Sequence, residues 1–250
     1  MPGAPSPVAS LPEGNLHVIY DDEFNGTSLS SNWATCWWYA PKSSDGGCSN
    51  GTGEGEWYRP QNVTVHDGML SLTAENQPVV GVNQSTGQPE TYNWTSGMVD
   101  GHGKFSFSYG YVEWRAQIPN GMGFWPALWL MPESGAWPPE IDALEMVGSQ
   151  PNVWTGTYHP PSGSAQGHDM TINGLYSGWH TFGVDWEPNS ITWYVDGTAV
   201  AQSTTNVTNT PMYLVMDLAV GGSWPGYPDA TTPFPSSLNI DYVRVWQSAP

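Results

Sequence analysis

The chain has 250 residues and a formal net charge of −18, because 23 acidic side chains outnumber five basic ones. A protein of this charge repels phosphate backbones and sulfated polysaccharides, so we expect neither nucleic acid nor another polyanion as its partner. Only 11% of the residues are charged, whereas glycine and proline number 29 and 23. This composition argues against a helical bundle and favours short strands joined by turns. No apolar run approaches the roughly 18 residues of a transmembrane helix, so no membrane partner is expected.

The first residues are rich in proline, and we expect residues 1–14 to form a linker ahead of a single domain over residues 15–250. No signal peptide is recognisable, as expected of a mature domain excised from a longer chain. Alternating or continuous apolar residues then predict strands at 111–118, 182–186, 191–195, 213–220 and 240–246. Asp196-Gly197, after the third of these, is a strong hairpin signal. Short strands separated by such turns predict an all-β sandwich or barrel.

Two cysteines, Cys36 and Cys48, lie in a stretch rich in glycine and serine. They are too few for a zinc cluster, and a disulfide between them stabilises the fold by about 3 kcal/mol. The alternative is a pair of reduced thiols in a cytosolic protein. Export is weakly favoured by glycosylation sequons, which also arise by chance in a chain rich in Asn, Ser and Thr. We expect a disulfide and a secreted, extracellular protein.

Three acidic residues, Glu140, Asp142 and Glu145, interrupt an otherwise apolar stretch. In a strand the first two share one face, whereas Glu145 points to the other unless a β-bulge near 143–144 brings it back. Three crowded carboxylates repel one another and raise at least one pKa, a cost that a chain seldom keeps without function. The alternatives are a solvated strand face and a metal site.

A pair of carboxylates about 5–5.5 Å apart is what retaining glycoside hydrolysis requires, one as nucleophile and one as acid/base. Strand offsets in this stretch are able to deliver such a spacing. Trp125 and Trp129, four positions apart on one strand face, are able to stack on sugar rings. The alternative for both tryptophans is packing in the core.

These residues resemble a known family. The stretch 140–145, preceded by 125–130, is similar to the bulged Glu-x-Asp-x-x-Glu motif of glycoside hydrolase family 16, in its laminarinase-like group. The resemblance extends, in order, over 22–26, 103–107, 178–186, 193–197, 218–222 and 240–246. It implies a jelly-roll β-sandwich of two antiparallel sheets with a concave carbohydrate-binding cleft. It also implies a retaining endo-β-1,3-glucanase, with mixed β-1,3/1,4-glucan as a further substrate.

The resemblance further assigns roles. It implies Glu140 as nucleophile, Glu145 as general acid/base and Asp142 as the residue that tunes their protonation, with no cofactor for catalysis. The residues that it implies for substrate binding are Trp57, Arg115, Trp125, Trp129, His159 and Trp224. It implies a structural calcium ion on the convex side, bound by Glu23, the backbone of Gly68 and Asp241, which are the hard oxygen donors that calcium prefers. Ordinary surface carboxylates are the alternative there.

Two other functions stay open at this point. One is a non-catalytic β-glucan-binding module, against which the intact Glu140 and Glu145 argue. The other is a related hydrolase or transglycosylase that acts on agarose or galactan. Loops around the cleft decide the linkage, and a sequence does not show their shape. We expect a monomer whose partner is a neutral β-glucan polysaccharide.

Overall fold

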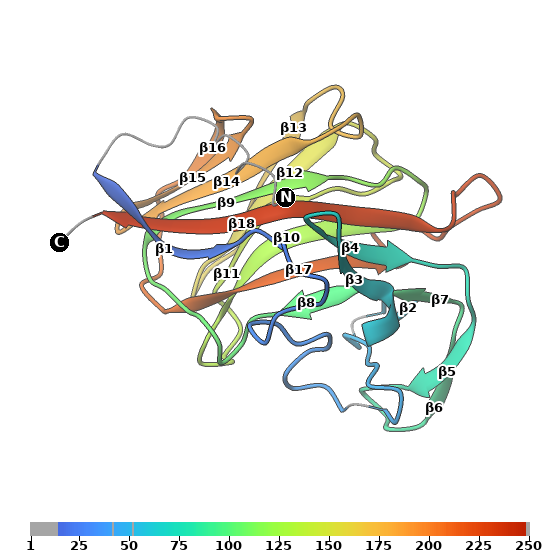
Figure 1. The fold of residues 1–250 in the computed structure, drawn as a ribbon. Coiled ribbons are helices and arrows are strands. Elements are labelled where there is room, and N and C mark those ends of the chain that lie inside the picture. Colours follow the sequence, from blue (N-terminus) through green and yellow to red (C-terminus); the bar gives the residue numbers. More distant parts are fainter. Residues whose placement is uncertain (1–14, 42, 52, 249–250) are drawn as a thin grey trace.

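The computed structural model describes residues 15–41, 43–51 and 53–248 (Figure 1). Within these ranges the chain forms strands and one short 3-10 helix, η1 (Pro60–Asn62). No helix in the described part is long and apolar enough to cross a membrane. The expected linker, 1–14, lies outside the described residues.

The larger sheet has eight antiparallel strands in the order β16-β15-β14-β9-β18-β4-β3, with β1 also paired to β18. In Figure 1, β18 is the long red strand, and its length allows it to pair with β9 along one edge and with β4 and then β1 along the other. The strands are β1 (Leu16–Asp22), β3 (Val63–His66), β4 (Met69–Ala74), β9 (Gly110–Gln117), β14 (His180–Glu187), β15 (Ser190–Val195), β16 (Thr198–Ser203) and β18 (Ser236–Ser248).

The smaller sheet has six antiparallel strands in the order β13-β12-β11-β10-β17-β8. They are β13 (Gln166–Thr171), β12 (Val153–His159), β11 (Glu140–Glu145), β10 (Phe124–Pro132), β17 (Met212–Val220) and β8 (Met98–Asp100). Two small pairs complete the fold at the lower right of Figure 1. They are the parallel pair of β2 (Glu56–Tyr58) with β7 (Trp94–Ser96) and the hairpin of β5 (Val79–Val82) with β6 (Pro89–Tyr92).

The core lies between the two large sheets. On β15 the predicted alternation is present, because Ile191, Trp193 and Val195 are buried while the residues between them are partly exposed. Asp196 and Gly197 both have positive φ, as a tight hairpin requires, and β16 follows them. On β10 the side chains of Leu128 and Leu130 point into the same core. The fold is a β-sandwich of two antiparallel sheets, one of the two architectures that the strand pattern predicted, and it agrees with the jelly roll that the family resemblance implied.

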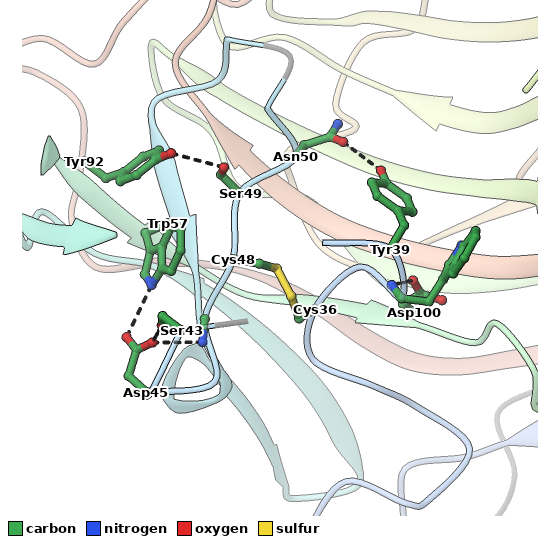
Figure 2. The surroundings of a disulfide bond; sticks show 12 residues. Cys36, Tyr39, Ser43, Asp45, Cys48, Ser49, Asn50, Trp57, Tyr92 and Asp100 are labelled. Carbon is green, nitrogen blue, oxygen red and sulfur yellow. Dashed lines mark hydrogen bonds between the residues drawn. A yellow bond between two sulfur atoms is a disulfide. The ribbon is translucent and has the colours of Figure 1, made fainter. Parts of the chain in front are cut away.

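One loop covers part of the outer face of the smaller sheet. Cys36 and Cys48 are joined by a disulfide, which ties together the two ends of this loop (Figure 2). The loop forms a second apolar cluster with Tyr213 and Val215 of β17, against which Trp129 packs. Side chains of this loop therefore lie next to Trp129, on the outer face of the smaller sheet.

Candidate active site

Strand β11 carries the three acidic residues, and its pairing contains a bulge. Against β10, Leu144 lies opposite Leu128 while Asp142 lies opposite Trp129, so Ala143 is the extra residue. The pairing with β12 shifts at the same place. As predicted, this bulge returns Glu145 to the outer face that Glu140 and Asp142 share, and the residues between them are buried in the core.

Two buried indoles satisfy backbone carbonyls at the bulge. The indole nitrogen of Trp193, on β15 of the other sheet, donates to the carbonyl oxygen of Asp142 at 2.7 Å. The indole nitrogen of Trp154 donates to the carbonyl oxygen of Ala143 at 3.1 Å. A buried carbonyl without a partner is costly, so these bonds stabilise the irregular backbone that aligns the carboxylates.

A cleft of about 650 Å³ lies over the outer face of the smaller sheet. Glu140, Asp142 and Glu145 all line it. The rest of its surface is mainly aromatic, from Trp37, Trp38, Tyr39, Tyr58, Trp125, Trp129, Trp137 and Trp224. Aromatic faces around a few convergent polar groups are typical of a ligand site, and here they suit flat sugar rings.

Each outer carboxylate accepts a hydrogen bond from a tryptophan of the cleft. The indole nitrogen of Trp137 donates to Oε2 of Glu140 at 2.7 Å. That of Trp125 donates to Oε1 of Glu145 at 3.1 Å, and the hydroxyl of Thr157 donates to its Oε2 at 3.3 Å. The orientation of Glu140 is therefore fixed from the loop before β11, and that of Glu145 from the neighbouring strands β10 and β12.

Burial and crowding raise the pKa of every carboxyl in this row. Burial raises the pKa of Glu140 to about 7, against the hydrogen bonds from Trp137 and Asp142, which lower it. Burial and the charge of Glu140 raise the pKa of Glu145 to about 8. Burial and the charges of its two neighbours raise the pKa of Asp142 well above its ordinary value. Near neutral pH the site therefore holds shared protons, as acid/base chemistry requires.

Three of the predicted substrate-binding tryptophans line the cleft. Trp125 and Trp224 meet edge to face, with ring centroids 5.0 Å apart. Trp129 lies farther along β10, and its indole nitrogen donates to Oδ1 of Asp217 at 2.8 Å. Asp217 also accepts a bond from the Tyr58 hydroxyl at 2.9 Å. Burial raises the pKa of Asp217 to about 7, while these bonds oppose the rise.

His159 lies beside the acidic row. It is directly opposite Glu140 across the β11–β12 pairing, and its Nε2 is 3.5 Å from Oε1 of Glu140. The same nitrogen is 3.6 Å from Oδ2 of Asp142. Burial lowers the pKa of His159, which favours the neutral ring. His159 thus lies beside Glu140 and Asp142, although it is not among the residues that line the cleft, and its part in substrate binding stays a prediction.

Two of the residues predicted to bind substrate lie away from the cleft. Trp57 is 1% exposed, because it is buried against Tyr92 and its indole nitrogen donates to Asp45 at 3.2 Å (Figure 2). Arg115 lies on β9 of the larger sheet, where it pairs with Asp241 at 2.7 Å and stacks over Trp179. Neither residue lines the cleft, and both predictions were wrong.

The expected calcium ligands lie near one another on the larger sheet, but arginines engage both carboxylates. Glu23 follows β1, and its two oxygens accept bonds from Arg244 at 2.6 and 2.9 Å. Asp241 accepts the bond from Arg115. Gly68 lies in the β3–β4 turn and has a positive φ. Each of the two carboxylates is thus already paired with a guanidinium group.

The sequence did not single out Trp137 or the aromatic side chains next to the disulfide. Trp137 lies only three positions before Glu140, is 60% exposed and lines the cleft. Trp38 is held by three contacts: its amide donates to Asp100, its ring stacks on His102 and its indole nitrogen donates to Tyr213. The run of aromatic residues after Cys36 was the signal that could have identified this wall of the cleft.

Comparison with known proteins agrees with this geometry. The model of glycosyl hydrolases family 16 matches residues 55–244. The endo-1,3-1,4-beta-glycanase ExsH of Rhizobium meliloti is 34% identical over 95% of this chain and 53% of its own length. The glucan endo-1,3-beta-glucosidase A1 of Niallia circulans is 33% identical over 93% of this chain and 38% of its own. The chain thus spans about half, or less, of these relatives.

A solved structure matches over its full length. The catalytic domain of an endo-1,3-beta-glucanase (laminarinase) from Thermotoga petrophila RKU-1 superposes with a TM-score of 0.82. It shares 31% of its sequence with this chain, and the match covers 95% of this chain and 100% of that one. With its bulged acidic strand, its aromatic cleft and these matches, the chain belongs to family 16 of the glycoside hydrolases.

Proposed function

We propose that this protein is a retaining endo-β-1,3-glucanase that also cleaves mixed β-1,3/1,4-glucan. The observation that carries the proposal is the alignment of Glu140, Asp142 and Glu145 on one face of a bulged strand, at the floor of a cleft lined with aromatic side chains. The activities by which the relatives are named, endo-1,3-1,4-beta-glycanase and endo-1,3-beta-glucanase, support both linkages.

In the proposed mechanism Glu140 attacks the anomeric carbon and Glu145 protonates the leaving glycosidic oxygen. Trp137 stabilises the charged form of Glu140 through its hydrogen bond, which favours the nucleophile. The charge of Glu140 raises the pKa of Glu145, which favours the acid. Once the glycosyl-enzyme forms, Glu145 is a carboxylate because its proton has left with the leaving group, and Glu140 carries no charge. The pKa of Glu145 is then lower, so Glu145 stays ionised and takes a proton from the attacking water. Asp142, between them, couples the two protonation states.

The surface of the cleft favours a neutral polysaccharide. Within the described part of the chain, neither lysine nor arginine lines it, so a sulfated substrate would meet carboxylates without compensating cations. Trp125 with Trp224 lies toward Glu145, whereas Trp137 lies at Glu140. Platforms at both ends of the acidic row suit a sugar chain that continues past the cleaved bond, which is the property of an endo-acting enzyme.

Export and calcium are separate proposals. The Cys36–Cys48 disulfide supports a secreted protein, because disulfides persist in oxidising compartments. For calcium, an ion would have to compete with Arg244 for Glu23 and with Arg115 for Asp241. The donors as paired do not fit a calcium ion, so no step of the reaction depends on one. We propose that calcium binds there too weakly to alter stability.

The test is the release of reducing sugar from laminarin, barley β-glucan, carboxymethyl cellulose and agarose. We expect release from the first two, with oligosaccharide products rather than glucose alone. The matched control is Glu140→Gln, which keeps the shape of the side chain and removes the nucleophile. A non-catalytic module would bind laminarin and release nothing, and release from agarose alone would show a galactan-degrading enzyme.

A further inference from the structure

A histidine and two carboxylates converge at one end of the cleft. One ligand atom from each of Glu140, Asp142 and His159 lies within 4.8 Å of the other two. The three side chains come from neighbouring strands, since Glu140 lies directly opposite His159 in the β11–β12 ladder. Because these strands lie inside the sheet, the positions of the donors are set by paired strands rather than by a loop.

The two separations from His159 match those of a tetrahedral metal site, and the third lies within 4.8 Å. Zinc binds histidine nitrogen and carboxylate oxygen at about 2.0–2.2 Å, which places neighbouring ligand atoms of a tetrahedron about 3.3–3.6 Å apart. The Nε2 atom of His159 is 3.5 Å from Oε1 of Glu140 and 3.6 Å from Oδ2 of Asp142. These distances are too long for hydrogen bonds, and they are the distances expected between two ligand atoms on a shared ion.

A second observation is one oxygen without a partner, in an Asp142 side chain that otherwise shares a hydrogen bond with Glu140. Oδ2 of Asp142 is buried and accepts no hydrogen bond from any described residue, in a side chain that is 3% exposed. A buried carboxylate oxygen without a donor is rare and costly. This oxygen is the one that lies toward His159. A bound cation would satisfy it and would also neutralise the crowded row.

We propose that Glu140, Asp142 and His159 form a binding site for a divalent transition ion of the Zn²⁺ type. The imidazole nitrogen selects such an ion over Ca²⁺ or Mg²⁺, which prefer oxygen donors. The two carboxylates must be ionised and the histidine neutral, so binding releases the protons that the carboxylates hold. Three protein ligands leave a fourth position, which water from the cleft can fill.

The consequence for activity rests on the proposed function. An ion bound to Oε1 of Glu140 withdraws the carboxylate that would attack the sugar, and it is held by two of the carboxylates that line the cleft. The ion therefore acts as an inhibitor that competes with glucan. The site would make the enzyme sensitive to the concentration of free transition metal around it.

The test uses Co²⁺ as a visible probe in a buffer without chelators, with protein that carries no histidine tag. We expect one Co²⁺ per chain with the visible absorption of a tetrahedral site, and Zn²⁺ should abolish that absorption. His159→Asn should weaken Zn²⁺ binding by about tenfold or more, since even residues behind a metal ligand contribute that much. Glu140→Gln, which keeps the side-chain shape, should do the same and guards against misfolding of the first variant.

The matched control is His180→Asn. His180 forms a similar histidine–carboxylate pair, with Asp196 at 2.8 Å, outside the cleft. We expect this variant to bind Co²⁺ like the unmodified protein. Binding that survives both His159→Asn and Glu140→Gln, or binding lost equally in His180→Asn, would overturn the proposal, as would the absence of any saturable Co²⁺ site.

Glucan hydrolysis is measured separately, so the two proposals fail independently. A protein that releases no sugar but shows the Co²⁺ site keeps the metal proposal and loses the glucanase. In an active enzyme, Zn²⁺ should raise KM for laminarin and leave kcat unchanged at saturating substrate, and laminarin should displace Co²⁺. Inhibition that lowers kcat alone would place the ion elsewhere.

Discussion

The indole nitrogen of Trp137 donates a 2.7 Å hydrogen bond to Oε2 of Glu140, the carboxylate proposed as the nucleophile. Trp125 donates in the same way to Glu145, the proposed acid/base, at 3.1 Å. Each bond lowers the pKa of its carboxyl, against burial, which raises it. The two tryptophans are therefore more than platforms for sugar, because each one acts on the protonation of one catalytic group.

The first prediction concerns pH and these two bonds. The value of kcat/KM should be bell-shaped, rising as Glu140 loses its proton near its pKa of about 7 and falling as Glu145 loses its own near about 8. Trp137→Phe removes one donor, so the acid limb should move to higher pH. Trp125→Phe should instead move the alkaline limb to higher pH. Both are measured on laminarin over pH 4 to 10.

The control is Trp224→Phe, which alters an aromatic residue of the cleft whose ring contacts Trp125 by its edge. It should raise KM and leave both limbs in place. If Trp137→Phe changed KM alone, the hydrogen bond to Glu140 would have no part in setting the charge of the nucleophile.

A second prediction concerns the stability cost of the acidic row. Because burial and the charge of Glu140 raise the pKa of Glu145 to about 8, the folded state keeps a proton that the unfolded chain loses near its ordinary pKa. Stability should therefore fall as pH rises from about 4.5 toward 8. Glu145→Gln removes this loss, so it should raise the melting temperature at pH 9 and leave it unchanged below pH 4.

In a protein of this size, the melting temperature should rise by about 2–4 °C for each kcal/mol gained in the free energy of unfolding. Differential scanning calorimetry at the two pH values measures it. Equal effects of Glu145→Gln at pH 9 and pH 3 would mean that packing, not charge, causes the change.

Much of the site was predictable because it depends on the spacing of residues within single strands. The bulge followed from three acids whose spacing cannot fit one face of a regular strand, and Trp125 and Trp129 share that face because side chains alternate. Their surroundings were not predictable in this way. Asp217 reaches Trp129 from a neighbouring strand that is 88 residues away in the sequence.

The wrong predictions have a common physical cause. Trp57 lies on a strand whose three residues are all buried, and no periodicity reveals that both of its faces are covered. Arg115 lies on a strand, as predicted, but that strand belongs to the larger sheet and not to the sheet that carries the cleft. The sheet that a strand joins is decided by partners far along the chain, here β18. Trp137 was not predicted because it lies in the loop before β11, where no side-chain alternation indicates which way a residue points.

A third prediction concerns the disulfide loop. Alkylation of the unreduced protein should find no free thiol, since Cys36 and Cys48 are bridged. The double variant Cys36→Ser with Cys48→Ser should lose about 3 kcal/mol of unfolding free energy in urea. It should also raise KM more than it lowers kcat, because Trp37 packs against Trp129 from this loop. A variant with unchanged KM would separate the loop from substrate binding.

A fourth prediction concerns calcium. Since Arg244 and Arg115 already pair with Glu23 and Asp241, neither chelation nor millimolar calcium should change the melting temperature. An ion that binds only the folded state would raise it in proportion to the logarithm of its concentration. Magnesium serves as the control for ionic strength. A rise specific to calcium would show that the ion displaces the arginines and would restore the ligand set that the sequence implied.

The last prediction concerns the division of labour between the two glutamates. Glu145→Ala removes the acid but leaves the nucleophile, so an aryl β-glycoside with a good leaving group should still form the glycosyl-enzyme. Added azide should then restore turnover and give a β-glycosyl azide, because it attacks from the side that Glu145 has vacated. Glu140→Ala should lose the intermediate, and azide entering in its place should give the α product. NMR of the products distinguishes the two. The reverse pattern would exchange the roles of Glu140 and Glu145, and inversion by the unmodified enzyme would exclude a covalent intermediate altogether.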